Sequence, residues 1–452
     1  MKQMLFASTN KTAPEVPLAE AIVQGQAPDK GLYLPVFIPR FAPGELASFR
    51  GKPYPEIAAA VLEKYTEGTF SPEMLNGMCR RAYDFDVPIE EVDSNRYVMR
   101  LDRGPTASFK DFAGRMMGRM LEAIRRNASN RLVILTATSG DTGSAVAHAF
   151  YKIPNVEVMV LFPPQEVSAR QRKQMTTLGE NITAVGVDGK FDDCQALVKQ
   201  AFTDDSLRHH IDLTSANSIN VGRLLPQIVY YVYAYVRLAH NGDRIIFSVP
   251  SGNFGNMMGA LLAGRMGVPV ERIVVSTNAN DEVPRFLETG RYEKIVPSRC
   301  CLSNAMNVGH PSNLARVVAL FDGWMDETGL LRKTPDMARM RNELWAAGID
   351  DLETRATIIK AWQRHHLLLE PHGAVGWLGL KRYLNRHPSS SKAVLVETAH
   401  PAKFPEEIEK LLGFSPEIPP GLADIEKKQE RCLSMPADYG AFRKLLRDHY
   451  SF

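Results

Sequence analysis

The sequence contains few cysteines, and they are not arranged as metal-binding or disulfide pairs. Only five occur among the 452 residues, and no two form a C-x-x-C pair. The adjacent Cys300 and Cys301 are too close together to serve as a zinc-binding pair. An odd number of scattered cysteines predicts free thiols, which are typical of a reducing compartment.

Long apolar runs, a secretory leader and a surplus of one charge are also absent. Apolar runs such as Val158–Phe162 are far shorter than the roughly 20 residues that span a membrane. Residues 1–10 lack the charged-then-apolar pattern of a signal peptide. The 54 basic and 51 acidic residues are spread along the chain and leave a net charge of +3. We therefore expect a cytoplasmic protein that binds neither membranes nor nucleic acid.

The composition that is present is ordinary for a globular protein. Hydrophobic residues make up 44% of the chain and charged residues 23%. The length predicts roughly two to four domains. Residues up to about 90 are predicted to be mostly helical, because Tyr54–Glu67 and Ser71–Phe85 carry apolar residues at helical spacing.

From about residue 97, short apolar runs alternate with longer amphipathic stretches. The predicted strands are Tyr97–Leu101, Leu132–Thr136, Val156–Phe162, Ile182–Val187, Arg244–Val249, Arg272–Ser276 and Ala393–Val396. The predicted helices between them include Phe112–Arg126, Thr142–Tyr151, Asp192–Phe202, Leu224–Leu238 and Asn256–Met266. This alternation predicts α/β layers with mainly parallel sheets, in which ligands bind at the carboxyl ends of strands near helix N-termini.

One loop after a predicted strand is rich in glycine. Its backbone N–H groups and the positive end of the following helix could hold a phosphate, although a tight turn without a ligand is an equal reading. The loop has neither the lysine of G-x-x-x-x-G-K-[ST] nor the spacing of G-x-G-x-x-G, which argues against a nucleotide-dependent kinase. The candidate residues are Gly252, Asn253, Phe254, Gly255 and Asn256.

A second loop, Thr138–Gly143, joins a predicted strand to a helix start and combines glycines with hydroxyl groups. Its donors, from Ser139, Gly140 and Thr142, could hold a carboxylate. The alternative is that Ser139 or Asp141 caps the helix and binds no ligand.

A third loop, Arg103–Phe112, leads from a strand into a helix and places Lys110 at the helix start. The helix dipole disfavours a cation there, which lowers the pKa of the amine and makes it more nucleophilic. Such a lysine suits a Schiff base. The alternative is an ordinary solvated lysine.

Two more stretches carry polar groups in positions that suit a site. Ser218, Asn220 and Arg223 precede a long apolar helix, and an arginine is well shaped to bind phosphate with two hydrogen bonds. Thr398 lies at the end of the last predicted strand. The alternatives are helix capping with a surface arginine, and a buried threonine hydroxyl bonded to the backbone.

In this order, the stretches resemble the threonine synthase family, in its longer form with an extra N-terminal domain. The resemblance extends from Gly31–Pro35 to Thr398–Phe404. Gly104–Phe112 is similar to the family's Schiff-base segment, and Pro250–Asn256 is similar to the loop that holds the cofactor phosphate. Ser139–Gly143 is similar to the loop that receives the substrate carboxylate near the hydroxyl of the cofactor ring. Two further segments resemble the family without an assigned role, Asn304–Asn313 and Glu370–Gly376.

The resemblance implies a pyridoxal 5'-phosphate enzyme of fold type II, the fold of the tryptophan synthase β subunit. Two α/β subdomains with parallel sheets would follow an N-terminal, mostly helical domain of residues 1–90. Residues 91–130 and 216–452 would form the large cofactor-binding domain, and residues 131–215 a smaller subdomain that moves over the substrate. The sequence leaves the oligomeric state open between monomer and homodimer.

The reaction implied is the conversion of O-phospho-L-homoserine and water to L-threonine and phosphate, a γ-elimination followed by addition of water at the β-carbon. Lys110 would hold the cofactor and then move protons, and Thr398 would bind the ring nitrogen. Ser218, Asn220 and Arg223, with Thr142, would bind the substrate phosphate. Asp141 would face the ring oxygen, where related enzymes often have asparagine, so its carboxylate would have to share a proton or face repulsion.

Two kinds of alternative stay open. A phospho-lyase or a serine/threonine dehydratase of the same fold would keep Lys110 and the glycine loop, but a dehydratase would have no need of Arg223. A non-catalytic binding protein on this fold would be free to lose Lys110 and Thr398, and both are present.

Overall fold

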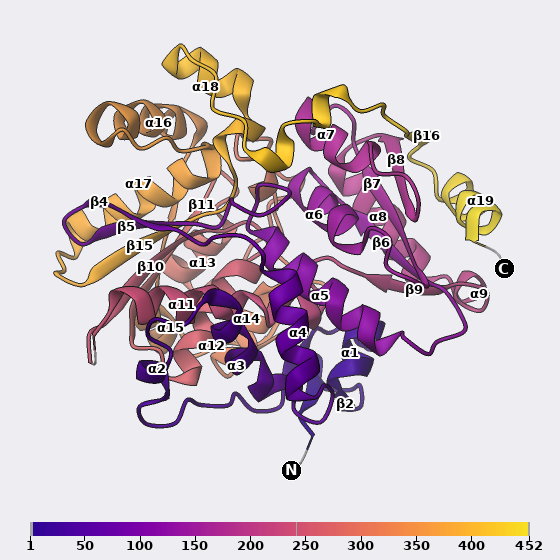
Figure 1. The fold of residues 1–452 in the computed structure, drawn as a ribbon, viewed down its shortest axis with the longest axis horizontal. Coiled ribbons are helices and arrows are strands. Elements are labelled where there is room, and N and C mark those ends of the chain that lie inside the picture. The colour runs from indigo at the N-terminus through magenta and orange to yellow at the C-terminus, as the bar shows by residue number, and fades with distance from the viewer. Residues whose placement is uncertain (1–2, 241, 451–452) are drawn as a thin grey trace.

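The computed structural model describes residues 3–240 and 242–450. Two large sheets, one mainly and one wholly parallel, lie side by side, and each is covered by helices on both faces (Figure 1). Within the described residues, no helix is long and apolar enough to cross a membrane. The predicted α/β class with mainly parallel sheets is confirmed.

The larger sheet has six strands, and only its edge strand β4 runs antiparallel. Helices α16 and α17 cover one face, where Val98, Ile246 and Val274 are buried. Helices α11 and α12 cover the other. In spatial order the strands are β14 (Leu344–Gly348), β11 (Val270–Thr277), β10 (Ile245–Pro250), β15 (Lys392–Glu397), β5 (Arg96–Arg100) and β4 (Ile89–Asp93). These helices are α11 (Gln227–Leu238), α12 (Gly255–Met266), α16 (Asp351–His365) and α17 (Pro371–Arg386).

The smaller sheet has five parallel strands, and most of it comes from residues 131–215. Its strands in order are β16 (Leu433–Pro436), β8 (Ile182–Asp188), β7 (Val156–Phe162), β6 (Leu132–Ala137) and β9 (Asp212–Ser215). Its helices are α6 (Asp141–Phe150), α7 (Ala169–Thr176), α8 (Phe191–Thr203) and α9 (Asp205–Arg208).

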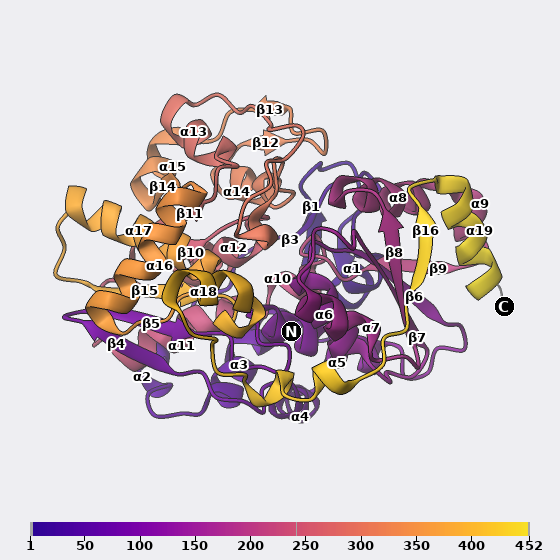
Figure 2. The same ribbon diagram turned by 90° about the horizontal axis from the view of Figure 1, so that it is seen from above.

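The C-terminal end of the chain corrects the predicted domain boundary. Residues 216–452 were expected to lie together in the large domain, yet β16 pairs with β8 of the smaller sheet. Helix α19 (Tyr439–Tyr450) buries Phe442 and Leu446 against the same sheet. Residues 413–432, here called the C-terminal strap, cross from α18 (Pro405–Leu412) to β16, as the yellow segment in Figure 2 shows. The rest of the predicted division, and the mobility of residues 131–215, stay predictions.

Charged pairs fasten the strap to α7. Glu426 accepts hydrogen bonds from Arg170 at 3.1 Å and from Lys173 at 3.0 Å. Glu430 receives two from Arg172, at 2.9 and 3.0 Å. Sequence periodicity could not find the strap, because its short turns and charged groups have no repeating apolar pattern.

The N-terminal segment combines the expected helices with a small sheet that the sequence did not predict. Helices α3 and α4 confirm the two predicted helical stretches, with ends shifted by at most three residues. The elements are β1 (Leu5–Ser8), β2 (Val16–Pro17), β3 (Tyr33–Pro35), α1 (Leu18–Gln24), α2 (Glu45–Ser48), α3 (Tyr54–Thr66) and α4 (Pro72–Ala82).

Three loops with candidate residues follow neighbouring parallel strands of the larger sheet. Strand β15 lies between β10 and β5, so the loops that begin at residues 251, 398 and 101 emerge at one edge. Because β10 leads to β11 on one side while β15 lies on the other, this edge is a topological switch point, where open α/β sheets bind ligands.

The remaining elements are α5 (Lys110–Ile124), α10 (Val221–Leu224), α13 (Glu282–Thr289), α14 (Leu314–Leu320), α15 (Met337–Glu343), β12 (Trp324–Met325), β13 (Leu331–Lys333) and the short helices η1 (Asn304–Met306), η2 (Pro401–Lys403), η3 (Pro420–Leu422) and η4 (Ile425–Lys427).

Candidate active site

Lys110 is the first residue of α5, as the sequence predicted, and its side chain is mostly buried. Burial lowers the pKa of Lys110 to about 8; Asp141 raises it in opposition, and Lys403 and Arg223 lower it further. A minority of this amine is therefore neutral near physiological pH, but a far larger share than for an ordinary lysine. A neutral amine is the form that adds to a carbonyl group or accepts a proton.

Asp141 is the first residue of α6 and lies at the centre of a hydrogen-bond network. Its Oδ2 is 3.9 Å from Lys110 Nζ, and its Oδ1 is 2.6 Å from Lys403 Nζ. Gln171 Nε2 donates a second hydrogen bond to Oδ1 at 3.0 Å. Burial favours the neutral acid, but Lys403 and Lys110 outweigh it and hold the pKa of Asp141 well below its ordinary value. Asp141 is thus a carboxylate with two cations beside it.

The loop before α6 is capped by a residue that the sequence analysis did not choose. Thr138 Oγ1 accepts hydrogen bonds from the N–H groups of Gly140 at 3.0 Å and Gly143 at 2.8 Å. Ser139 and Thr142 are partly exposed on either side of the helix start. Gly140 has φ +140°, and a Cβ there would lie 2.5 Å from Gln171 Nε2. Glycine at position 140 therefore lets Gln171 approach Asp141.

The glycine loop turns sharply into α12. Phe254, directly before the helix, has φ 61°, and a Cβ on Gly252 would lie 2.7 Å from Met306 Cα. Asn253 Nδ2 donates to Ser218 Oγ at 2.7 Å, and Asn313 Nδ2 donates to the Asn253 carbonyl at 2.9 Å. The loop, Ser218 and Asn313 therefore form one unit at the start of α12, whose first N–H groups have no acceptor within the helix.

Two asparagines predicted as ligand contacts use side-chain atoms in hydrogen bonds within the fold. Asn220 is fully buried, donates to the carbonyls of Ile22 and Ser215, and accepts from Gly222 N. Asn256 Oδ1 accepts from the hydroxyl groups of Tyr230 and Tyr231, both at 2.6 Å. We assign the Asn220 side chain to holding α10. Asn256 uses its Oδ1 in the fold, whereas its buried Nδ2 has no hydrogen-bond partner within the described residues and remains a donor for a ligand.

Arg223 on α10 is buried. The alternative interpretation of the sequence, a surface arginine, is therefore wrong. Its Nη1 donates to the Ala216 carbonyl at 2.6 Å, and within the described residues its buried Nε has no hydrogen-bond partner. Burial lowers the pKa of Arg223 to about 10, partly offset by Asp111, so the group stays charged at neutral pH. A buried guanidinium with an unused donor is a suitable partner for an anion.

Thr398 meets the lysine loop at the end of β15. Its carbonyl accepts from Phe109 N at 2.9 Å, one residue before Lys110. The preceding residue, Glu397, is fully buried, and its carboxyl oxygens have no hydrogen-bond partner within the described part of the chain. Burial, reinforced by Glu370, raises the pKa of Glu397 well above its ordinary value, so Glu397 is a neutral acid.

The two segments without an assigned role also reach this region. Glu370 accepts from His372 Nδ1 at 2.5 Å, and His372 Nε2 accepts from Ala305 N at 3.1 Å. Asn304 Nδ2 then donates to Gln171 Oε1 at 3.1 Å. This chain of contacts joins α17, η1 and α7, so it links the two sheets above Asp141.

Sequence reasoning missed the roles of Lys403, Gln171 and Arg316. Lys403 lies in a segment that was noticed only for its resemblance. Arg316 on α14 is fully buried and donates to the carbonyls of Tyr33, Ser218 and Ile219 and to Asn313 Oδ1. Nothing in the local sequence marks these side chains as buried. The sequence shows only that each is a charged or amide side chain within a helix or turn.

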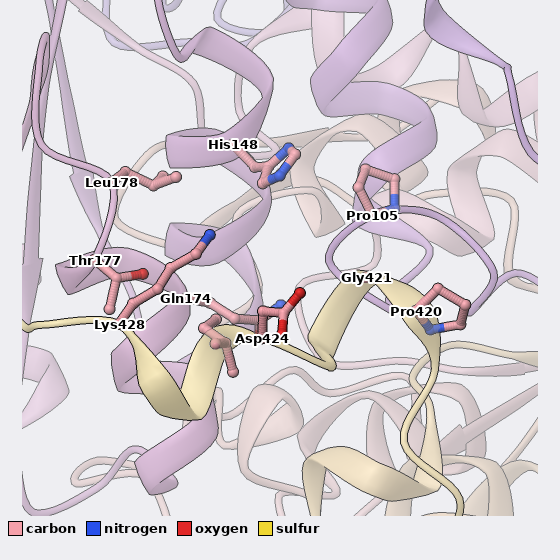
Figure 3. A pocket seen from close by; sticks show the side chains of 10 residues that line it. Pro105, His148, Gln174, Thr177, Leu178, Pro420, Gly421, Asp424 and Lys428 are labelled. Atoms are coloured by element: carbon pink, nitrogen blue, oxygen red, sulfur yellow. The ribbon is translucent and has the colours of Figure 1, made fainter.

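A separate cavity of about 170 Å³ lies beside the lysine loop (Figure 3). His148 on α6, Pro105 at the start of the loop, and Gly421 and Asp424 on the strap face it. Within the described residues, its lining includes none of the predicted site residues.

The arrangement fits pyridoxal 5'-phosphate. A buried lysine of lowered pKa can bind its aldehyde, and the start of α12 with Ser218 can bind its phosphate. Thr398 stands beside the lysine loop, and Asp141 faces Lys110. The orphaned buried Nε of Arg223 adds a donor for a second anion.

Comparison with known proteins agrees with this geometry. Residues 87–399 match the family described as pyridoxal-phosphate dependent enzyme, residues 5–83 the threonine synthase N terminus, and residues 373–446 the threonine synthase C-terminal family. The chain is 41% identical to threonine synthase of Haemophilus influenzae over 408 residues, which is 90% of each chain. It is 40% identical to that of Escherichia coli over 436 residues, covering 96% of this chain and 97% of the relative.

A solved structure of threonine synthase from Brucella melitensis with bound pyridoxal phosphate superposes with a TM-score of 0.91 at 34% identity, covering 100% of both chains. These matches confirm the predicted fold type II and the cofactor. The chain belongs to the threonine synthase family of pyridoxal-phosphate-dependent enzymes.

Proposed function

We propose that this protein converts O-phospho-L-homoserine and water to L-threonine and phosphate, the last step of threonine biosynthesis, in the cytoplasm. The observation that carries this proposal is that Lys110 is mostly buried and Arg223 is buried at this site. A base of lowered pKa and a buried guanidinium with a free donor lie close enough for the charge of Arg223 to lower the pKa of Lys110. A reaction that moves protons and expels phosphate needs both groups.

The binding roles follow from where the groups lie. The backbone N–H groups of residues 252–256, with Ser218, hold the cofactor phosphate, and Thr398 binds the ring nitrogen. Asp141 faces the ring oxygen. Ser139 receives the substrate carboxylate at the start of α6, where the helix dipole favours an anion. Gly140, predicted to share this role, has its only donor, the backbone N–H, bonded to Thr138 Oγ1. Arg223, with Thr142, binds the phosphate of the substrate, while Ser218, predicted to share this role, is bonded to Asn253 of the glycine loop.

When bound, the cofactor supplies an electron-accepting ring that stabilises negative charge on the substrate α-carbon. Lys110, once released by the substrate amine, is neutral and removes the α-proton. A second proton leaves the β-carbon as phosphate leaves the γ-carbon, and Arg223 stabilises the charge that grows on the phosphate. One proton then returns to the γ-carbon and makes the methyl group, water adds its hydroxide at the β-carbon and releases its other proton, and a second proton returns to the α-carbon, with Lys110 as the donor to both carbons. The buried surroundings exclude other water until this step.

The test of the proposal is to incubate the purified, cofactor-loaded protein with O-phospho-L-homoserine and to measure threonine and phosphate in the same samples. We expect the two products in a ratio of one to one. Phosphate with a keto acid in place of threonine would indicate a phospho-lyase. A keto acid formed from serine or threonine, with no phosphate from the phosphorylated substrate, would indicate a dehydratase.

Arg223→Ala should reduce turnover by at least about 100-fold and raise KM for O-phospho-L-homoserine, because it removes the cation that binds the leaving phosphate. The measurement is steady-state phosphate release. Arg237→Ala is the matched control, since Arg237 is an exposed arginine on the neighbouring helix α11. If Arg223→Ala folds and turns over as the control does, the phosphate assignment is wrong.

A further inference from the structure

Asp141 has two lysine partners, which differ in their distance from the carboxylate and in their role. Lys110 lies 3.9 Å away and is the lysine that binds the cofactor under the proposed function. Lys403 lies 2.6 Å away and is fully buried. Lys403 also donates to the Thr106 carbonyl at 3.0 Å, so its ammonium group is held at a fixed place beside the carboxylate.

The charge on Lys110 cannot be constant. The amine must be neutral to bond to the cofactor, and it must be neutral again to accept a proton from the substrate. A buried carboxylate that loses its only cation is strongly disfavoured and takes up a proton instead. A site with Lys110 alone beside Asp141 would therefore change the charge of Asp141 during each turnover.

We propose that Lys403 is the permanent counter-ion of Asp141, which keeps this carboxylate ionised whatever the charge on Lys110. Lys403 is a positioning residue, because it acts on the cofactor and on Lys110 through Asp141. Beside the ring oxygen, the carboxylate of Asp141 therefore stays paired even when Lys110 is neutral, because Lys403 neutralises its charge.

Both subdomains hold Lys403 in place. Its N–H donates to the His400 carbonyl at 2.9 Å within the large domain. Its own carbonyl accepts from Ser168 Oγ at 3.2 Å, and Arg170 donates to the Ala402 carbonyl beside it. Ser168 and Arg170 belong to the start of α7, the helix that also carries Gln171. The lysine and the amide that bind Asp141 are thus fixed by the same junction.

The charged groups that face Lys110 and Asp141 determine in which direction the pKa of Lys110 changes when Lys403 is replaced. The groups are Asp141 and Glu370, which raise the pKa of Lys110, and Lys403 and Arg223, which lower it, with His372 acting on Asp141. Lys403→Met removes a positive charge and leaves Asp141 to pair with Lys110. The pKa of Lys110 should then rise from about 8 by about one unit or more.

The experiment is trace acetylation of the full-length protein without cofactor, at a series of pH values, with the modification of Lys110 measured by peptide mass spectrometry. Lys403→Met should shift the midpoint upward and Asp141→Asn should shift it downward. The double variant should return it toward the original value. Lys403→Arg, which keeps the charge, should move it least. The cofactor-loaded proteins provide a second readout, the pH dependence of their visible absorption.

Lys173→Met is the matched control, because this lysine lies on α7 and pairs with Glu426 of the strap, away from Asp141. An unchanged Lys110 midpoint in Lys403→Met would overturn the proposal. If Lys403→Met fails to fold, the double variant decides: folding restored by Asp141→Asn supports the counter-ion role, and folding lost in both backgrounds contradicts it. The labelling needs neither substrate nor cofactor, so a failure of the proposed function would leave its outcome interpretable.

Discussion

Replacing Lys110 by alanine should leave a folded protein that forms no threonine. We expect the rate of threonine release to fall by at least about 10³-fold, because the variant loses both the amine that binds the cofactor and the base that moves the protons. The fold should survive, since Lys403 still pairs with Asp141 at 2.6 Å when Lys110 is gone. The measurement is the one-to-one release of threonine and phosphate, together with the visible absorption of the loaded protein.

The attachment site can be mapped independently of activity. Treating the loaded protein with borohydride should fix the cofactor to one peptide, and mass spectrometry should place it on Lys110. Lys403 is the informative rival, because its ammonium group also lies beside Asp141. A cofactor adduct on Lys403, or an absorption band that persists in Lys110→Ala, would contradict the assignment. Lys381→Ala serves as a control for the loss of a partly buried lysine elsewhere on the large domain.

Arg316→Ala should destabilise the protein by about 3–5 kcal/mol, the largest stability effect that we expect from a single substitution. The guanidinium is fully buried and donates to four oxygen atoms, three of them backbone carbonyls of the N-terminal segment and of the Ser218 loop. Burial lowers the pKa of Arg316 to about 9, so the group is still charged at neutral pH. Removing it leaves these acceptors buried without a donor.

The loss should appear as a lower urea midpoint and a weaker affinity for pyridoxal phosphate, because Arg316 also holds Asn313, which bonds to the glycine loop. Arg332→Ala is the matched comparison: Arg332 is exposed and pairs with Asp326, and its removal should cost no more than about 1 kcal/mol. Equal urea midpoints for the two variants would show that the Arg316 contacts contribute little net stability.

The sequence was most informative about the central strands and the helices that follow them. Strand β7 begins and ends where predicted, at Val156 and Phe162, and β6 exceeds its prediction by one residue. A buried parallel strand is apolar on both faces, so the ends of the apolar run in the sequence mark the ends of the strand. Edge strands do not share this property. Strands β9 and β16 are short, partly exposed and flanked by polar residues, and they were missed.

Part of the candidate site was predicted from the sequence. The residues that were predicted and those that were missed differ for a physical reason. Lys110, the glycine loop and Thr398 were chosen because each lies between a strand and a helix, a position that local sequence reveals, and the structure brings their loops to one edge of the larger sheet. Lys403 and Gln171 were missed because their importance depends on contact with Asp141 across more than 25 residues of chain. Asn220 shows the reverse case. Its amide side chain suggested a ligand contact, but it is buried and donates to backbone carbonyls of α1 and β9.

By itself, the sequence determined the α/β class, the order of the main elements, the family and the lysine at the start of α5, because these depend on periodicity and on residues adjacent in the chain. Only the tertiary structure decided which polar groups are buried together. It placed Lys403 and Gln171 on Asp141, left the Nε of Arg223 without a partner and brought the C-terminal strand to the smaller sheet. Burial and pairing are properties of contacts between distant segments, and those contacts set the charge of each group in the site.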